Sequence, residues 1–129
     1  MTPIELKERT KAYALRVIRL VDALPASRSA DVLGRQLLRS GTSVGANYRA
    51  ACRARSHADF ISKLGIVEEE CDESLYWMEL LVAAKKVAAA RVANLMTEGN
   101  ELLSIIVASV RTSRTRRNPQ SAIRNPQSK

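Results

Sequence analysis

At 129 residues with a net charge of +8, the chain is long enough to bury one hydrophobic core and too short for two domains. Hydrophobic residues make up 46% of it and aromatic residues only 4%, a composition typical of packed helices. No apolar run approaches the roughly 18 residues of a membrane span, and no basic segment followed by an apolar stretch begins the chain. We therefore expect an all-α protein of the cytoplasm with no membrane contact.

The first predicted helix begins near Pro3. Thr2 can act as its N-cap, Pro3 suits the first helical position, and Glu5 is the reciprocal partner of a capping box. Apolar residues then recur every three or four positions until Pro25 ends the helix.

Two glycines, Gly41 and Gly45, lie within a second stretch that allows two interpretations. The stretch is either a phosphate-cradling loop or the middle of a helix that needs small residues on one side. Apolar residues keep a single helical phase across both glycines, and neither the pattern GxxxxGK[ST] nor a preceding strand is present. We predict one unbroken helix over residues 28–55, with Gly41 facing a closely packed neighbouring helix.

Arginines occupy the opposite side of this second helix, within about 80° of one another at about 100° per residue. Such a row matches the repeating charge of a nucleic-acid backbone, so we predict RNA or DNA binding here. The alternative is a protein-interaction scaffold, in which the arginines pair with acidic residues of neighbouring subunits. The predicted nucleic-acid-binding residues are Arg28, Arg35, Arg39, Arg49 and Arg53.

The third predicted helix follows a second capping pattern, Ser56 with Asp59, and carries two apolar stripes. One stripe repeats every three or four residues from Phe60 to Leu81, which is the seam of a helical bundle. The other lies on roughly the opposite side, where the core of one bundle cannot also cover it. We therefore expect a subunit contact formed by Ile66, Trp77 and Leu80.

A fourth helical pattern runs from Val92 to Val110. The join around residues 85–90 has no Gly, Pro or clear cap, so a fusion of the third and fourth helices stays an alternative. From Arg111 onward the chain has six cations, no acid and two copies of "RNPQS". This polar, proline-bearing segment cannot bury enough apolar surface to become ordered, so we predict a disordered basic tail.

No catalytic or metal site is predicted. A dinuclear carboxylate centre in a bundle needs two Glu-x-x-His pairs, and His57 is the only histidine. Cys52 and Cys71 lie on apolar faces without CxxC spacing, which favours buried free thiols over a nucleophile, a disulfide or a metal site. We expect a protein that is not an enzyme and that needs no cofactor.

Residues 35–81, above all the runs "SGTSVGANYR", "ADFISKL" and "YWMELL", resemble the small four-helix-bundle proteins encoded in intervening sequences of bacterial 23S ribosomal RNA genes. The resemblance extends more loosely over about residues 5–112. It implies an antiparallel up-down four-helix bundle with a turn near residues 85–90. We accordingly assign residues 1–112 to the bundle and residues 113–129 to the disordered tail.

These proteins are related to the accessory variability determinant proteins of diversity-generating retroelements. The accessory proteins associate as a basic, barrel-like pentamer that binds nucleic acid and a reverse transcriptase. The resemblance therefore implies a homo-oligomer, a pentamer by this analogy, with nucleic acid and a reverse transcriptase as candidate partners.

Overall fold

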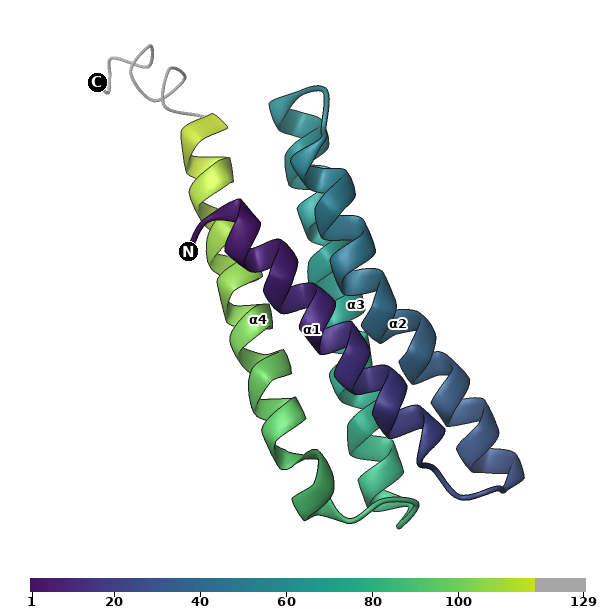
Figure 1. The fold of residues 1–129 in the computed structure, drawn as a ribbon. Helices are drawn as coiled ribbons and strands as arrows, with labels where there is room; N and C mark the ends of the chain where they lie inside the picture. The colour runs from purple at the N-terminus through teal and green to yellow at the C-terminus, as the bar shows by residue number, and fades with distance from the viewer. Residues whose placement is uncertain (118–129) are drawn as a thin grey trace.

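The computed structural model describes residues 1–117, which form four helices and no strand. Successive helices run antiparallel, and each packs against its neighbours in a closed ring, with α1 also contacting α4 (Figure 1). This arrangement confirms the predicted all-α up-down bundle. None of these helices is both long and apolar enough to cross a membrane. The helices are α1 (Pro3–Asp22), α2 (Arg28–Cys52), α3 (His57–Ala83) and α4 (Ala89–Arg117).

The starts of the first three helices are fixed by side-chain caps. The Thr2 backbone N–H donates to Oε1 of Glu5 at 2.7 Å, and the Glu5 N–H donates to Oγ1 of Thr2 at 3.1 Å, which confirms the predicted capping box. Ser27 caps α2 and Ser56 caps α3, each accepting the N–H of the third helical residue. The Asp59 carboxylate accepts the N–H of residue 55 rather than that of the cap, so the second reciprocal box is incomplete.

The predicted helix through both glycines is confirmed, because α2 is continuous across residues 40–48, although it ends at Cys52 rather than at residue 55. A Cβ atom added at Gly41 would lie 2.8 and 2.9 Å from the two γ-methyl groups of Val17 in α1. One added at Gly45 would lie 3.2 Å from Oγ1 of Thr10. The glycines therefore permit the close approach of α1 and α2, and no phosphate-cradling loop exists at this point.

The core contains a buried polar contact between α1 and α3, against which α4 packs. The Tyr13 hydroxyl of α1 donates to Oγ of Ser74 at 2.8 Å, and Ser74 in turn donates to the Cys71 carbonyl at 2.7 Å. Gly99 of α4 makes room for the tyrosine, because a Cβ atom there would lie 2.9 Å from its hydroxyl oxygen. Burial raises the pKa of Tyr13, so the phenol stays protonated as the donor.

The turn between α3 and α4 excludes the fused helix. Lys85 adopts the left-handed conformation with φ of 61°, and its N–H donates to the Val82 carbonyl at 2.9 Å. The Lys86 N–H donates to the Leu81 carbonyl at 2.9 Å. These two bonds form a Schellman motif, whose left-handed position is usually a glycine. The predicted turn near residues 85–90 is thus confirmed, although a lysine takes the position that glycine favours.

The C-terminal part of α4 corrects the predicted end of the bundle. The helix continues to Arg117, five residues beyond residue 112. Ser113 is buried, and its carbonyl oxygen accepts a hydrogen bond from Nε2 of His57 at 2.7 Å. This bond ties the end of α4 to the start of α3, so residues 113–117 belong to the helix rather than to the tail. The rest of the predicted tail, residues 118–129, lies outside the described residues.

Candidate nucleic-acid interface

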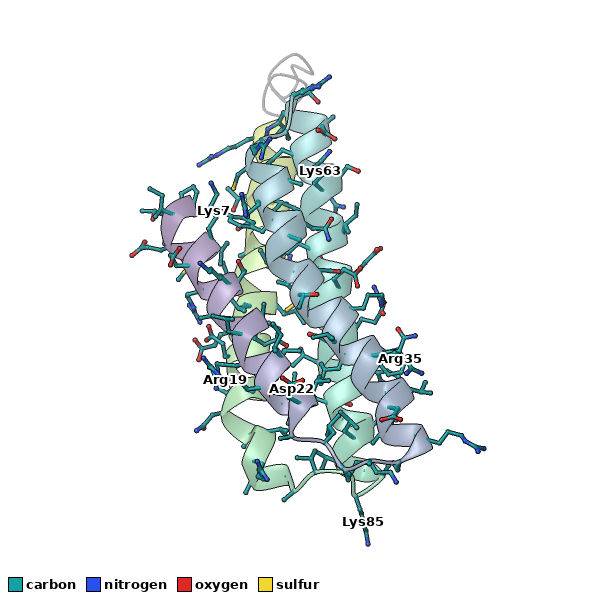
Figure 2. All side chains as sticks on the ribbon, turned by 45° about the vertical axis from the view of Figure 1, so that its right-hand side comes forward. Lys7, Arg19, Asp22, Arg35, Lys63 and Lys85 are labelled. Atoms are coloured by element: carbon teal, nitrogen blue, oxygen red, sulfur yellow. The ribbon has the colours of Figure 1, made fainter. Side chains whose placement is uncertain are left out.

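All five predicted arginines are exposed; four lie on α2, where Figure 2 labels Arg35, and Arg53 is the C-cap of that helix. The middle one is engaged with α3: both Oε atoms of Glu70 accept from Arg39 at 3.1 Å, and Glu73 accepts from its second terminal nitrogen. The Glu70 carboxylate thereby raises the pKa of Arg39. Among the described residues, the other four arginines form no ion pair.

The C-terminal end of this arginine row lines a surface hollow of about 730 Å³, here called the α2–α3 hollow. Its basic residues come from α2, from the turn and from α3, around a wall of two alanines. The hollow is lined by Ala46, Arg49, Ala50, Arg53, Arg55, Asp59 and Lys63.

The one acid of the α2–α3 hollow is already occupied. The Asp59 carboxylate accepts from Nζ of Lys63 at 2.8 Å and from the Arg55 backbone N–H at 3.4 Å. The contact with Lys63 lowers the pKa of Asp59, which therefore stays ionised and bound to the lysine at neutral pH. Within residues 1–116, Arg49, Arg53 and Arg55 form no ion pair, although the charge of Arg55 is close enough to help lower the pKa of Asp59.

The last turns of α4 add positive charge to the same end of the bundle, beside the α2–α3 turn (Figure 1). The hydrogen bond from His57 to the Ser113 carbonyl anchors this end. Arg111, Arg114 and Arg116 are exposed there. The predicted tail, residues 113–129, includes Arg114 and Arg116, because no apolar periodicity extends past Val110 to predict a helix there.

The three residues predicted for a subunit contact have different environments. Ile66 is 41% exposed, whereas Trp77 and Leu80 are half-buried, and Trp77 packs against the core. The Trp77 indole Nε1 is buried without a hydrogen-bond partner among the described residues. The neighbouring Tyr76, which the apolar stripes did not include, is 51% exposed and contacts the Trp77 ring edge to face, with ring centroids 5.3 Å apart.

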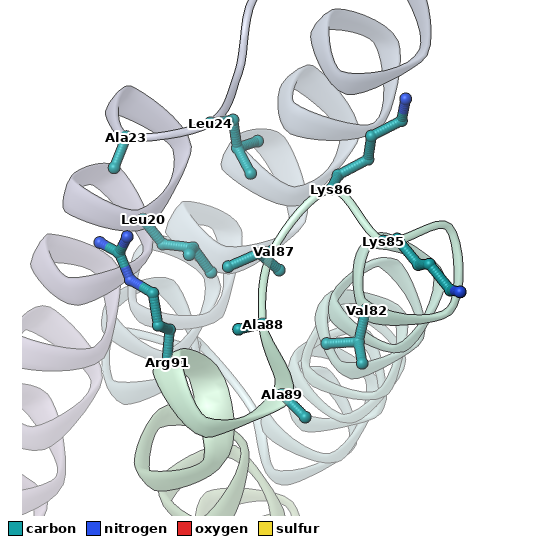
Figure 3. A pocket seen from close by; sticks show the side chains of 10 residues that line it. All are labelled: Leu20, Ala23, Leu24, Val82, Lys85, Lys86, Val87, Ala88, Ala89 and Arg91. Carbon is teal, nitrogen blue, oxygen red and sulfur yellow. The ribbon is translucent and has the colours of Figure 1, made fainter.

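A second hollow, of about 540 Å³, lies where the end of α1 meets the α3–α4 turn (Figure 3). Leu20, Leu24 and Val87 project into it, while the ammonium groups of Lys85 and Lys86 point away. Its lining contains no acid, histidine, cysteine or hydroxyl side chain that could act as a nucleophile, a general base or a metal ligand. Within residues 1–117, no group of three or more His, Cys, Asp or Glu is placed to hold a metal ion.

A family model described as "23S rRNA-intervening sequence protein" matches residues 3–108, which is most of the bundle. The chain belongs to this family. A crystal structure from Bacteroides thetaiotaomicron, described as a protein of unknown function from the S23 ribosomal protein family, is 32% identical and superposes with a TM-score of 0.80. That match covers 86% of this chain and 99% of the other. No curated protein matches the chain.

The arginines of α2 lie inside the range that the family model matches. Arg111, Arg114 and Arg116 lie beyond it. The basic end of the bundle therefore combines a segment inside the family match with a C-terminal extension of α4 that the match does not include.

Proposed function

We propose that this member of the 23S rRNA-intervening sequence protein family is a non-enzymatic, homo-oligomeric bundle that binds RNA or DNA. The observation that carries the proposal is the α2–α3 hollow, where three arginines surround a single acid that already pairs with Lys63. A guanidinium group presents several N–H donors in a plane and matches the oxygens of a phosphate. The exposed arginines at the end of α4 extend the same basic surface.

The chemistry of the hollow favours contacts with the backbone over contacts with bases. Its walls are Ala46 and Ala50, and its lining has no aromatic ring on which a base could stack, so its ligand-binding groups are cationic donors that match phosphate oxygens. Contacts to phosphates position a nucleic acid without specifying its sequence. We therefore expect similar affinities for unrelated sequences and a steep dependence on salt.

The alternative function, a protein-interaction scaffold, is supported by the pairing of Arg39 with Glu70 and Glu73. In that case the remaining arginines would pair with acids of an adjacent subunit, and exposed acids such as Asp72 and Glu79 of α3 are suitable partners. The two functions differ in one measurable respect, because only the first requires a nucleic acid to be retained at low salt.

The oligomer rests on a separate observation, which is the exposed apolar surface of Ile66 and Tyr76 on α3. The pentameric state, and a reverse transcriptase as a protein partner, rest only on the resemblance to the accessory variability determinant proteins. Neither is needed for the binding of phosphates by the α2–α3 hollow.

The test uses a chain that ends at Arg117. This truncation removes Arg124 and Lys129 with the tail and keeps the whole of α4, whereas a chain ending at Val110 would lose Ser113 and its bond to His57. Any binding that the shortened chain keeps therefore comes from the bundle.

Fluorescence anisotropy with a labelled RNA or DNA duplex, measured over a series of salt concentrations, then gives the slope of log K against log salt. Replacing Arg49 and Arg53 with Gln should reduce that slope by about 0.9 for each phosphate that the protein no longer neutralises. A control variant with Lys7 and Lys11 replaced by Gln removes the same charge from α1 and should change the slope less. Equal effects of the two pairs would exclude the hollow, and no retention by the wild type at low salt would leave the scaffold as the function.

A further inference from the structure

A third hollow, of about 320 Å³, lies in the groove between α1 and α4 and is here called the α1–α4 hollow. Its cations come from two helices that are far apart in the sequence. It shares Leu20, Ala23 and Arg91 with the hollow of Figure 3, so the two hollows are adjacent. The α1–α4 hollow is lined by Arg16, Arg19, Leu20, Ala23, Arg91, Asn94 and Leu95.

The three arginines of this hollow form a cluster of like charge. Its lining contains no acid, and among the described residues Arg16, Arg19 and Arg91 form no ion pair. Asp22, the acid closest to them along α1, lines a separate hollow between α1 and α2. Like charges gathered without an acid repel one another, and a bound anion would relieve this repulsion.

Nearer the start of α1, the same groove contains an arginine that is neutralised by acids. Arg9 lies seven residues before Arg16 on α1, and Glu98 and Glu101 of α4 both accept hydrogen bonds from it. About two turns earlier, α4 instead presents Arg91 in its first turn, near the positive end of its helix dipole. Acids of α4 therefore neutralise Arg9, whereas the arginines of the α1–α4 hollow are left to bind an external anion.

The α1–α4 hollow and the α2–α3 hollow lie in different parts of the molecule. One is in the groove between α1 and α4, and the other is at the turn between the two remaining helices (Figure 1). Figure 2 shows Lys63 near one end of the bundle and Arg19 in the other half. A nucleic-acid segment docked in one hollow thus leaves the other accessible.

We infer that the α1–α4 hollow is a second phosphate-binding site, and that each chain therefore holds two segments of nucleic acid. This inference rests on the proposed function. The three guanidinium groups and the Asn94 amide supply donors for phosphate oxygens. The aliphatic residues Leu20, Ala23 and Leu95 offer no surface for base stacking, so this site also contacts the backbone.

The number of hairpins bound per chain tests this inference. Isothermal titration of the chain ending at Arg117 with an RNA hairpin of about ten base pairs, one turn of the duplex, counts the sites at low salt. The wild type should bind two hairpins per chain. A variant with Arg16, Arg19 and Arg91 replaced by Gln should bind one, and so should a variant with Arg49, Arg53 and Arg55 replaced by Gln. Counting per chain separates two sites on one chain from single sites brought together in an oligomer.

Circular dichroism first establishes that both variants keep the helical content and melting temperature of the wild type. A wild type that binds one hairpin per chain, with no change in the α1–α4 variant, overturns the second site and leaves the proposed function intact. If the wild type binds no hairpin, the proposed function fails. Titration with inorganic pyrophosphate then tests whether the α1–α4 hollow binds an anion. Binding of pyrophosphate that disappears in the α1–α4 variant supports an anion site there, and the absence of any binding overturns it.

Discussion

Gly41 and Gly65 both lie inside helices, yet replacement by alanine should have opposite effects at the two positions. A Cβ atom added at Gly65 would meet no heavy atom within 4 Å. The only effect there is the higher helix propensity of alanine, which should raise the free energy of unfolding by about 0.5 to 1 kcal/mol. Gly65→Ala is therefore the matched control for the crossing of α1 and α2.

At Gly41 the same gain in propensity is opposed by a steric clash. The new Cβ atom would lie 2.8 and 2.9 Å from the γ-methyl groups of Val17 and 3.2 Å from its Cβ atom. A valine in a helix has one strongly preferred rotamer, so it cannot turn both methyl groups away and α1 must move. Overpacking of this kind costs about 1 to 3 kcal/mol. The net effect of Gly41→Ala is a loss of about 0 to 2.5 kcal/mol, and a larger loss is expected for Gly41→Leu.

Thermal unfolding followed by circular dichroism, at one fixed protein concentration, measures the difference. A change of 1 kcal/mol corresponds to about 3 to 5 °C for a domain of this size. In a Val17→Ala background, which removes both methyl groups, Gly41→Ala should cost less or become stabilising. The reasoning is refuted if Gly41→Ala is as stable as Gly65→Ala, or if its cost is unchanged when Val17 is absent.

Three further predictions concern the turn, the subunit contact and the thiols. Lys85→Gly should raise the free energy of unfolding by about 1 kcal/mol, because glycine adopts the left-handed conformation without strain. Lys85→Ala should not raise it. A lower melting temperature for the glycine variant would contradict the Schellman turn. Ile66→Asp and Leu80→Asp should lower the mass measured by light scattering, whereas Ile4→Asp, at an isoleucine that is 73% exposed on α1, should leave it unchanged. A wild-type chain that is monomeric at micromolar concentration rules out the subunit contact. Burial raises the pKa of Cys71 to about 12, so a thiol reagent at mildly alkaline pH should modify only Cys52 in the folded protein and both cysteines after unfolding. Because the unfolded thiol of Cys71 ionises near 9.0, this residue also makes stability fall as the pH rises from that value toward 12.

Local signals in the sequence were sufficient to predict most of the bundle. The Thr2 and Glu5 capping box fixes the start of α1, and the seam of α3 follows from its apolar residues alone. The glycines of α2 were the hardest case, since glycine usually disfavours a helix interior. The prediction was correct there because the apolar phase on both sides of Gly41 and Gly45 fits only one continuous helix.

Features without a local sequence signal, among them those that depend on contacts between distant residues, could not be predicted in this way. The α3–α4 turn has Lys85 where a glycine would have marked it. The end of α4 contains mainly polar and basic residues, and a hydrogen bond to His57 from another helix holds it. No spacing rule relates Arg16 and Arg19 to Arg91, because only the antiparallel packing of α1 on α4 brings them into one hollow.

The arginines of α2 lie on one side of the helix, but the structure shows that some are paired with acids and others are not. Arg39 faces Glu70 and Glu73, so a phosphate backbone placed along the middle of α2 would meet carboxylates as well as a guanidinium group. Exposed ion pairs of this kind contribute about 0 to 1 kcal/mol each, which is enough to occupy Arg39 but leaves the pair sensitive to salt. Arg49 and Arg53 have no such partner within the described part of the chain and join Arg55 in a hollow. Binding should therefore depend on the end of α2 more than on its middle, which distinguishes a docking site at one end of the bundle from a track along the whole helix.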